Sequence, residues 1–237
     1  MAYSQVNKAF FKKTLRAVLP TRFPAIVVAS MGRSGSTVVY SAIRDGLAEQ
    51  RFHHLPSNIA SRIVSDSAWD LASTKLQKGV VYKTHAHSHE LSATPYAKVV
   101  FLYGSASDAA LSVFACNQKY GPAWTARHFD HMRAKGSFAD LPFEDVLRFG
   151  EQLDGWLGCP SVPTLGINYE ELWTHEERIS EFVGFPIRLP RRRSRSNKHM
   201  IPEAIRCQVE SSYASLDRRI SDLPGALIVS GGRAQGL

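Results

Sequence analysis

Cysteine is scarce in this sequence. Cys116, Cys159 and Cys207 are the only cysteines among 237 residues, and they are far apart and odd in number. Disulfide-stapled small domains and cysteine-ligated zinc modules need more cysteines at closer spacing, so both classes are excluded. This usage favours a reducing, cytoplasmic location.

The sequence also lacks a continuous apolar run of the roughly 20 residues that span a bilayer. Residues 1–24 instead carry apolar side chains at helical spacing, with lysines and an arginine between them. This pattern predicts an N-terminal amphipathic basic helix that docks on the domain. The alternative for the same pattern is peripheral contact with a membrane surface through residues 1–20, which would make the protein membrane-associated.

Acidic residues are in the minority. The chain has 29 lysines and arginines against 21 aspartates and glutamates, a formal net charge of +8 at pH 7. This excess favours anionic partners, but charge alone does not choose between a nucleotide, a sulfated or phosphorylated substrate, nucleic acid and an acidic membrane. A hydrophobic fraction of 44% is typical of one compact domain, which we place at residues 25–237.

Apolar segments typical of buried strands alternate with helical patterns along this domain. The alternation implies crossover units, a parallel sheet and a ligand site at the carboxyl ends of the strands. We therefore predict a three-layer α/β fold with a mainly parallel central sheet. Residues 49–79 allow only loosely placed helices. The predicted strands are 25–30, 80–85, 98–103 and 164–169, and the predicted helices are 37–46, 108–116, 123–134, 143–157, 176–183 and 202–220.

A small-residue loop, Gly32-Arg33-Ser34-Gly35-Ser36-Thr37, lies between the first strand and its helix. This arrangement aims backbone N–H groups and a helix N-terminus at an anion, and the glycines let the backbone approach phosphate oxygens closely. A Walker A loop would need glycine at Ser30 and lysine at Ser36, so an ATPase or GTPase is disfavoured. We expect a P-loop-like phosphate-binding loop after the first strand.

Four segments in order resemble the sulfotransferases that use 3′-phosphoadenosine-5′-phosphosulfate (PAPS). Val28 to Thr37 resembles their 5′-phosphosulfate loop, and its Arg-Ser-Gly-Ser form is similar to the carbohydrate-modifying branch. Tyr82-Lys83-Thr84-His85 resembles the end of their next catalytic strand. Phe101 to Phe114, with Asp108 and Ser112 at matching places, is similar to their 3′-phosphate strand and helix. Residues 168–184 resemble a Tyr-Glu-Asp-Leu strand end followed by a Phe-Leu-Gly helix end.

The resemblance implies transfer of a sulfuryl group from PAPS to an acceptor hydroxyl, leaving 3′-phosphoadenosine-5′-phosphate (PAP) and using no metal. The Arg-Ser-Gly-Ser form favours a sugar or glycoconjugate as the acceptor, such as a glycan or glycolipid, while lipid, peptide-antibiotic and small-metabolite hydroxyls stay open. No nucleic acid is expected as a partner. Lys83 and Arg33 would stabilise the leaving oxygen, and His85 would act as general base. The donor would be held by Arg33, Ser34, Gly35, Ser36, Thr37, Ser112, Arg192 and Arg193.

The chemistry of sulfuryl transfer suits these residue types. The reaction resembles phosphoryl transfer, an in-line displacement with a loose transition state in which positioning and charge placement do most of the catalysis. A base whose pKa lies near the working pH assists the attacking hydroxyl. Lys83 and His85 are two residues apart, so an extended strand would present them on the same side.

Gly104 departs from the family pattern. Counting back from Ser112, Gly104 stands where the family has an arginine that grips the 3′-phosphate. A basic run before the last helix offers replacements, and family members place a basic loop there. The alternative interpretation of this basic run is a solvated segment or a nonspecific polyanion site. The run comprises Arg188, Arg191, Arg192, Arg193, Arg195 and Lys198.

Two other functions stay open. A non-catalytic nucleotide- or polyanion-binding protein on the same fold is supported by Gly104. A metallohydrolase is supported by the alternation of His85, His87 and His89, whose imidazoles would converge on a metal if the strand continued. For His128 and His131, in the helix at 123–134, we favour a solvated helix face over the wall of an acceptor pocket.

Overall fold

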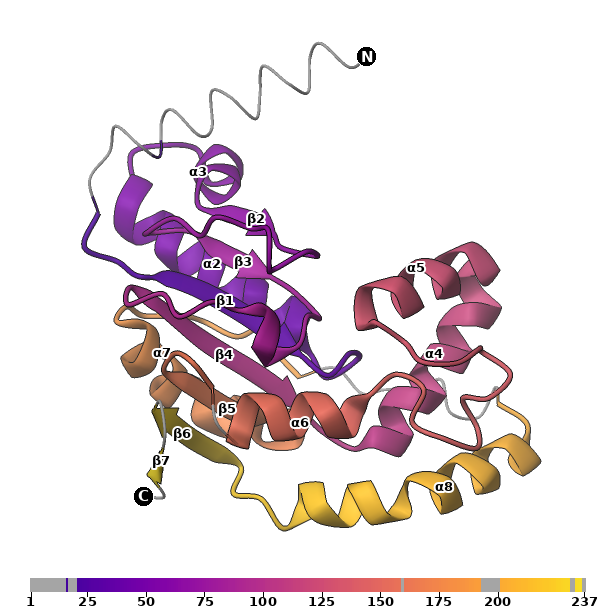
Figure 1. Cartoon of the computed structure of the whole chain (residues 1–237). Helices are drawn as coiled ribbons and strands as arrows, with labels where there is room; N and C mark the ends of the chain where they lie inside the picture. Colours follow the sequence, from indigo (N-terminus) through magenta and orange to yellow (C-terminus); the bar gives the residue numbers. More distant parts are fainter. Residues whose placement is uncertain (1–15, 17–20, 159, 193–200, 231–232, 236–237) are drawn as a thin grey trace.

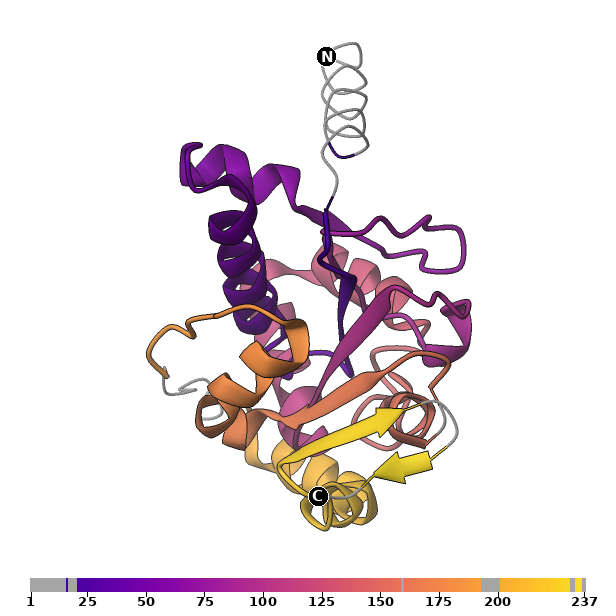
Figure 2. The same ribbon diagram turned by 90° about the vertical axis from the view of Figure 1, so that its left-hand side faces the viewer.

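The computed structural model describes residues 16, 21–158, 160–192, 201–230 and 233–235. Its centre is a seven-stranded sheet of order β2-β3-β1-β4-β5-β6-β7, with helices on both faces (Figures 1 and 2). The predicted α/β architecture with a mainly parallel central sheet is confirmed. The strands are β1 Ala25–Ser30, β2 Ser65–Ser67, β3 Val81–Lys83, β4 Ala97–Tyr103, β5 Thr164–Asn168, β6 Ala226–Ser230 and β7 Arg233–Gln235.

The first five strands in chain order all run parallel, and β6 and β7 pair antiparallel at one edge. β1 lies between β3 and β4, and each of its residues is fully buried, as expected of a central parallel strand covered on both faces. Its register pairs Val28 with Lys83 of β3 and with Val100 of β4. The carboxyl ends of these three strands therefore meet at one edge of the sheet.

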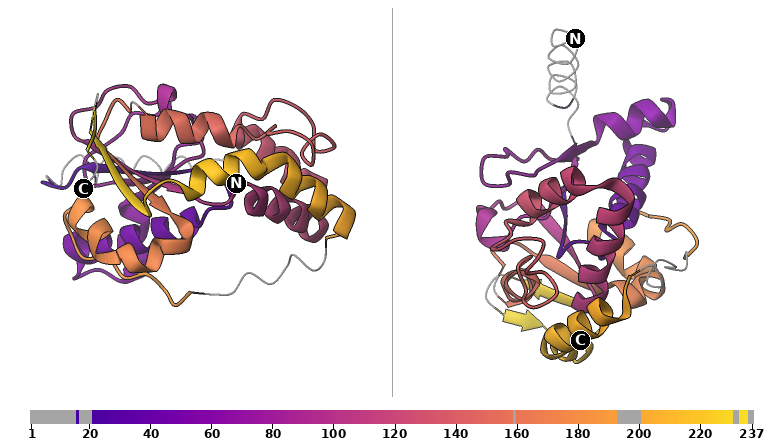
Figure 3. Two further views of the ribbon diagram at one scale, coloured as in Figure 1. Left: turned by 90° about the horizontal axis from the view of Figure 1, so that it is seen from below. Right: turned by 90° about the vertical axis from the view of Figure 1, so that its right-hand side faces the viewer.

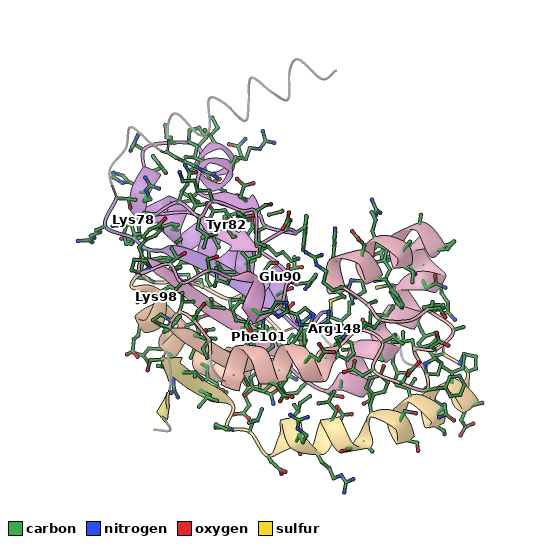
Figure 4. All side chains as sticks on the ribbon, viewed as in Figure 1. Lys78, Tyr82, Glu90, Lys98, Phe101 and Arg148 are labelled. Carbon is green, nitrogen blue, oxygen red and sulfur yellow. The ribbon has the colours of Figure 1, made fainter. Side chains whose placement is uncertain are left out.

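Two hydrophobic cores lie on the two faces of the sheet. One contains the β1 side chains of Val27 and Ala29 with residues of α4, α6 and α8, and the other contains Ile26 and Val28 with residues of α2, α3 and α7. Figure 3 shows α6 and α7 on opposite sides of the sheet. Phe101 of β4, labelled in Figure 4, stacks with Trp156 of α6 at 6.1 Å. The α-helices are α2 Ser36–Phe52, α3 Ser57–Ile63, α4 Ala106–Tyr120, α5 Pro122–Met132, α6 Phe149–Gly158, α7 Glu176–Val183 and α8 Glu203–Ser221, and the 3-10 helices are η1 Ser88–Glu90 and η2 Tyr169–His175.

Two helix boundaries differ from the prediction by six residues, each for an identifiable reason. α2 continues to Phe52 because Gly46 does not end it: a Cβ at Gly46 would lie 2.5 Å from the Pro186 carbonyl oxygen, so this glycine permits close packing. α6 begins at Phe149 rather than near residue 143, because the Asp145 carboxylate accepts hydrogen bonds from the N–H groups of Phe149 (2.9 Å) and Gly150 (2.8 Å). This carboxylate satisfies the free N–H groups at the start of the helix.

Of the predicted N-terminal helix at 1–24, the structure describes Arg16 and residues 21–24. Arg16 is buried, donates to the Ile63 carbonyl (2.6 Å) and pairs with Asp66 (3.0 Å). The rest of that helix, and its alternative of membrane contact through residues 1–20, lies outside the described residues. Within the described part of the chain, no helix combines the length and apolar character needed to cross a membrane.

Candidate functional site

The loop after β1 has three residues in the left-handed region of backbone conformation. Gly32, Arg33 and Gly35 have positive φ angles of 78°, 53° and 81°. The Ser34 hydroxyl donates to the Gly32 carbonyl at 2.8 Å, so this buried serine stabilises the turn from inside. α2 begins at Ser36 with no side-chain cap and no acidic residue in its first turn. The positive end of this helix is therefore not neutralised by a side chain of its own first turn.

Both glycines of the loop are also required by packing. A Cβ at Gly35 would lie 2.5 Å from Cε2 of the Tyr169 ring, and one at Gly32 would lie 2.9 Å from Sδ of Met132. Tyr169 begins η2 after β5, and Met132 ends α5. The loop is thus held between two neighbouring elements and cannot accept larger residues without displacement.

A pocket of about 690 Å³ opens at the carboxyl ends of β1, β3 and β4, between the loop and the pair α4 and α5. Figure 1 shows α4 and α5 beyond the carboxyl ends of these strands. The volume lies within the range typical of small-molecule sites, about 300–1,000 Å³. The predicted site residues that line it are Arg33, Gly35, Ser36, Thr37, Lys83, His85 and Ser112.

Lys83 reaches the loop from the last position of β3. Its Nζ donates to Oγ1 of Thr37 at 2.6 Å, which joins the end of β3 to the first turn of α2. Burial lowers the pKa of Lys83, and the nearby Arg33 guanidinium lowers it further. Two cations thus approach the same place, an arrangement that an anion would stabilise, and one carboxylate, that of Asp108, lines the same pocket.

His85 lies just past β3 and is buried against the start of the loop. Its Nδ1 lies 3.0 Å from the Ser30 hydroxyl and 3.2 Å from the Ser30 carbonyl oxygen. A carbonyl only accepts, so a hydrogen bond to it places the proton on Nδ1 and the lone pair on Nε2, whereas the Ser30 hydroxyl can pair with either tautomer. Burial, followed by the charge of Lys83, lowers the pKa of His85 to about 4, so the imidazole is neutral at pH 7.

α6 fixes the segment that carries His85. Gln152 donates through Nε2 to the His85 carbonyl at 3.1 Å, and Trp156 donates through Nε1 to the Ala86 carbonyl at 3.2 Å. Both side chains are fully buried. The backbone around His85 is therefore held by a helix on one face of the sheet, which limits movement of the imidazole.

Arg33 and Ser112 contact each other directly. Nε of Arg33 donates to the Ser112 hydroxyl at 2.9 Å, and the guanidinium lies over the Trp124 ring at 5.8 Å. Ser112 is on α4 and Trp124 is on α5. The loop arginine is therefore directed toward α4 and α5.

Of the predicted arginines 192 and 193, the structure describes Arg192. Arg192 pairs with the Glu170 carboxylate and lies 5.5 Å from the Trp173 ring centroid, and it is not among the residues that line the pocket. Arg193, Arg195 and Lys198 lie outside the described residues.

The start of α4, where the family arginine would stand, is closed to an anion. Gly104 is buried, and a Cβ there would lie 3.3 Å from Cβ of Tyr169. The Asp217 carboxylate of α8 accepts from the N–H groups of Ala106 (2.5 Å) and Ser107 (3.4 Å). A protein carboxylate thus already occupies the positive end of α4.

Sequence reasoning missed the contribution of α5, and its interpretation of His128 was wrong. His128 is only 7% exposed and lines the pocket together with Trp124, Arg127 and His131. The spacing 124, 128, 131 and 132 follows one helix face, a signal that indicates packing rather than solvation. α5 is therefore a wall of the pocket.

The three alternating histidines do not share a strand. β3 ends at Lys83, and His89 lies in η1. The His87 side chain instead takes part in a capping box with Glu90. Among the residues that the structure describes, no three His, Cys, Asp or Glu side chains gather as a metal-binding group.

No family model matches this chain, and no curated protein matches it.

Proposed function

We propose that this protein transfers a sulfuryl group from PAPS to an acceptor hydroxyl of a sugar or glycoconjugate. The observation that carries the proposal is the convergence of the loop after β1, the Lys83 ammonium and the neutral His85 imidazole on one pocket. The sequence resemblance assigns the same three parts to the donor phosphosulfate and to the base. Their convergence supports the proposal, because those parts lie about 50 residues apart in the chain.

In the proposed reaction, the acceptor oxygen forms a bond to sulfur as the bond from sulfur to the 5′-phosphate oxygen breaks. Negative charge grows on the leaving oxygen, where Arg33, Lys83 and the N-terminus of α2 stabilise it. The acceptor proton moves to Nε2 of His85. The donor's negative charge raises the pKa of His85 from the low value of the free protein, which improves it as a base.

Arg127 is the best candidate for the cation that replaces the missing family arginine. It lines the same pocket as Ser112, from α5, and is exposed. Arg192, by contrast, is engaged by Glu170. We therefore place the donor 3′-phosphate between Arg127 and Ser112, where the cations Arg33 and Arg127 outnumber the Asp108 carboxylate that lines the same pocket.

The proposal is tested by titrating the purified full chain with PAP in a calorimeter and by measuring transfer of radiolabelled sulfate from PAPS to a panel of glycosides. We expect saturable PAP binding and transfer that depends on both substrates. Absence of PAP binding at millimolar ligand would refute the proposal.

A non-catalytic nucleotide-binding protein on the same fold is the second candidate. Two features favour it. Gly104 stands where the family has the arginine that grips the 3′-phosphate, and the Asp217 carboxylate already accepts from the N–H groups at the start of α4. Tight binding of PAP without transfer to any hydroxyl in the panel would select this function over the enzyme.

A further inference from the structure

The α5 wall of the pocket contains an imidazole with an unsatisfied nitrogen. Nε2 of His128 is buried and has no hydrogen-bond partner among the described residues. His128 itself is 7% exposed and lines the pocket. A buried polar atom without a partner is unfavourable, so a ligand group that pairs with this nitrogen would be stabilised.

Aromatic rings surround this nitrogen. Trp124 stacks on His128 at 4.9 Å, with the planes 16° apart, and the rings of His128 and His85 meet edge to face at 5.8 Å. Trp69, whose ring lies 5.6 Å from that of His85, stacks on His131 at 4.2 Å, with the planes 4° apart. The imidazole proposed as general base therefore lies close to two stacked pairs, of which Trp124, His128 and His131 line the pocket and offer flat faces that suit a ring.

Contacts outside the rings hold these pairs in place. Arg133 donates to the Trp69 carbonyl at 2.6 Å and pairs with Glu90 at 3.1 Å. Glu90, labelled in Figure 4, comes from the segment after β3, so the pairing joins that segment to the end of α5. Thr125 donates to Asn117 at 2.7 Å and ties α5 to α4. The wall is thus preorganised.

The charges of the pocket define which ligand group suits His128. Burial lowers the pKa of His128 to about 3, so the ring is neutral, and an acid group that required the imidazolium would be opposed. A cationic group would meet three cations, Arg33, Lys83 and Arg127, and one carboxylate, Asp108, among the described residues that line the pocket. A hydroxyl both donates and accepts, so it satisfies Nε2 in either tautomer.

We propose that α5 supplies the acceptor subsite: a ring that carries hydroxyls lies against the stacked pairs, one hydroxyl bonds to Nε2 of His128, and its neighbour faces His85. This proposal rests on the proposed function and adds the acceptor class, a neutral ring alcohol. Glycosyl and aryl rings share this chemistry, and the test separates them.

The test uses the full chain saturated with PAP and measures binding of methyl β-galactoside, of 4-nitrophenol and of glycerol by saturation-transfer NMR. We expect one of the two rings to bind and glycerol, which has hydroxyls but no ring, to give no saturable signal. His128→Phe keeps a flat ring but removes the nitrogen, and it should weaken ring binding by about tenfold or more. His128→Gln, whose amide reaches the position of Nε2, should retain more binding than His128→Asn.

PAP binding is measured first for every variant, and it separates the two proposals. If the native chain does not bind PAP, the proposed function fails. If PAP binds but neither ring does, or if His128→Phe binds the ring as well as the native chain, the acceptor subsite is overturned. The exposed His53→Gln variant serves as the matched control and should change nothing.

Discussion

At the residue scale, a two-residue step from Lys83 to His85 places an ammonium group and an imidazole in one pocket. The strand that would align them ends at Lys83, yet both side chains line the pocket because α6 holds the backbone beyond the strand. The two groups are suited to different tasks. Lys83 contacts the first turn of α2, and His85 presents Nε2 as an acceptor.

Replacing His85 separates catalysis from donor binding. His85→Gln should leave the Kd for PAP within about twofold and lower kcat by about 10²–10⁴, the usual contribution of a general base. Calorimetry and a transfer assay give the two quantities. An equal loss for His53→Gln, or unchanged kcat in His85→Gln, would contradict the role of His85.

Replacing Arg127 tests the position of the donor 3′-phosphate. Loss of a hydrogen bond to a charged group costs about 1.5–3 kcal/mol, so Arg127→Ala should weaken PAP binding about 10- to 100-fold. Binding of adenosine 5′-phosphate, which lacks the 3′-phosphate, should stay the same. Arg192→Ala should have little effect on either ligand because Glu170 already pairs with it. The reverse ranking of the two variants would place the 3′-phosphate at Arg192.

At the element scale, the junction of β1, the loop and α2 depends on two glycines and on the element behind them. Tyr169 of η2 leaves no room for a side chain at Gly35, which is also the N-cap of α2. The loop conformation is thus determined jointly by its own sequence and by the end of β5. The sequence pattern predicted the loop. The contact between Gly35 and Tyr169 could not be predicted in this way, because only the fold brings these two distant residues together.

Two alanine variants separate strain from packing at this junction. Gly35 and Gly184 are similar left-handed positions (φ 81°, ψ 7° and φ 86°, ψ 22°), but a Cβ at Gly184 meets nothing within 4 Å. Gly184→Ala should therefore lower the free energy of unfolding only by the cost of placing an alanine in the left-handed region, about 1–2 kcal/mol. Gly35→Ala should lower the free energy of unfolding by more than Gly184→Ala does, and it should also weaken PAP binding. Urea unfolding and calorimetry measure both, and equal costs for the two variants would argue against the packing constraint.

At the scale of the whole molecule, buried neutral histidines make stability depend on pH. The pKa values of His85 and His128 are lowered to about 4 and about 3, whereas an unfolded histidine has a pKa of 6.5. Below pH 6.5 the unfolded chain binds more protons than the folded one at these sites. The folded state is therefore destabilised relative to the unfolded state as the pH falls below 6.5.

We expect the free energy of unfolding to decrease between pH 7 and pH 5, with a smaller slope when His85 and His128 are both replaced by glutamine. Asp145 acts in the opposite direction because burial raises its pKa, but it is common to both proteins. Urea unfolding at several pH values gives the slope. The exposed pair His53→Gln and His54→Gln is the control, and an equal flattening there would contradict the assignment.

The parts of the molecule that sequence predicted are those with a strong local signal. β1, β4 and β5 are short apolar runs, and the site residues of the loop and of β3 follow directly from such runs. β2, with the sequence Ser-Asp-Ser, has no strand pattern and exists through its pairing with β3. The α5 wall was missed because the burial of His128 depends on packing against the loop, at Gly32. These features are therefore determined by pairing and packing between distant segments, which the local sequence pattern does not show.

The contacts of Arg33 with Ser112 and of Lys83 with Thr37 have a kinetic consequence. Each cation already contacts a hydroxyl beside the place proposed for the anion, so an arriving ligand would meet side chains that are already held near their positions. Few side chains would then have to become ordered when the ligand binds, so this ordering would not slow association. The rate of encounter would be governed by long-range attraction and would fall steeply as added salt screens it.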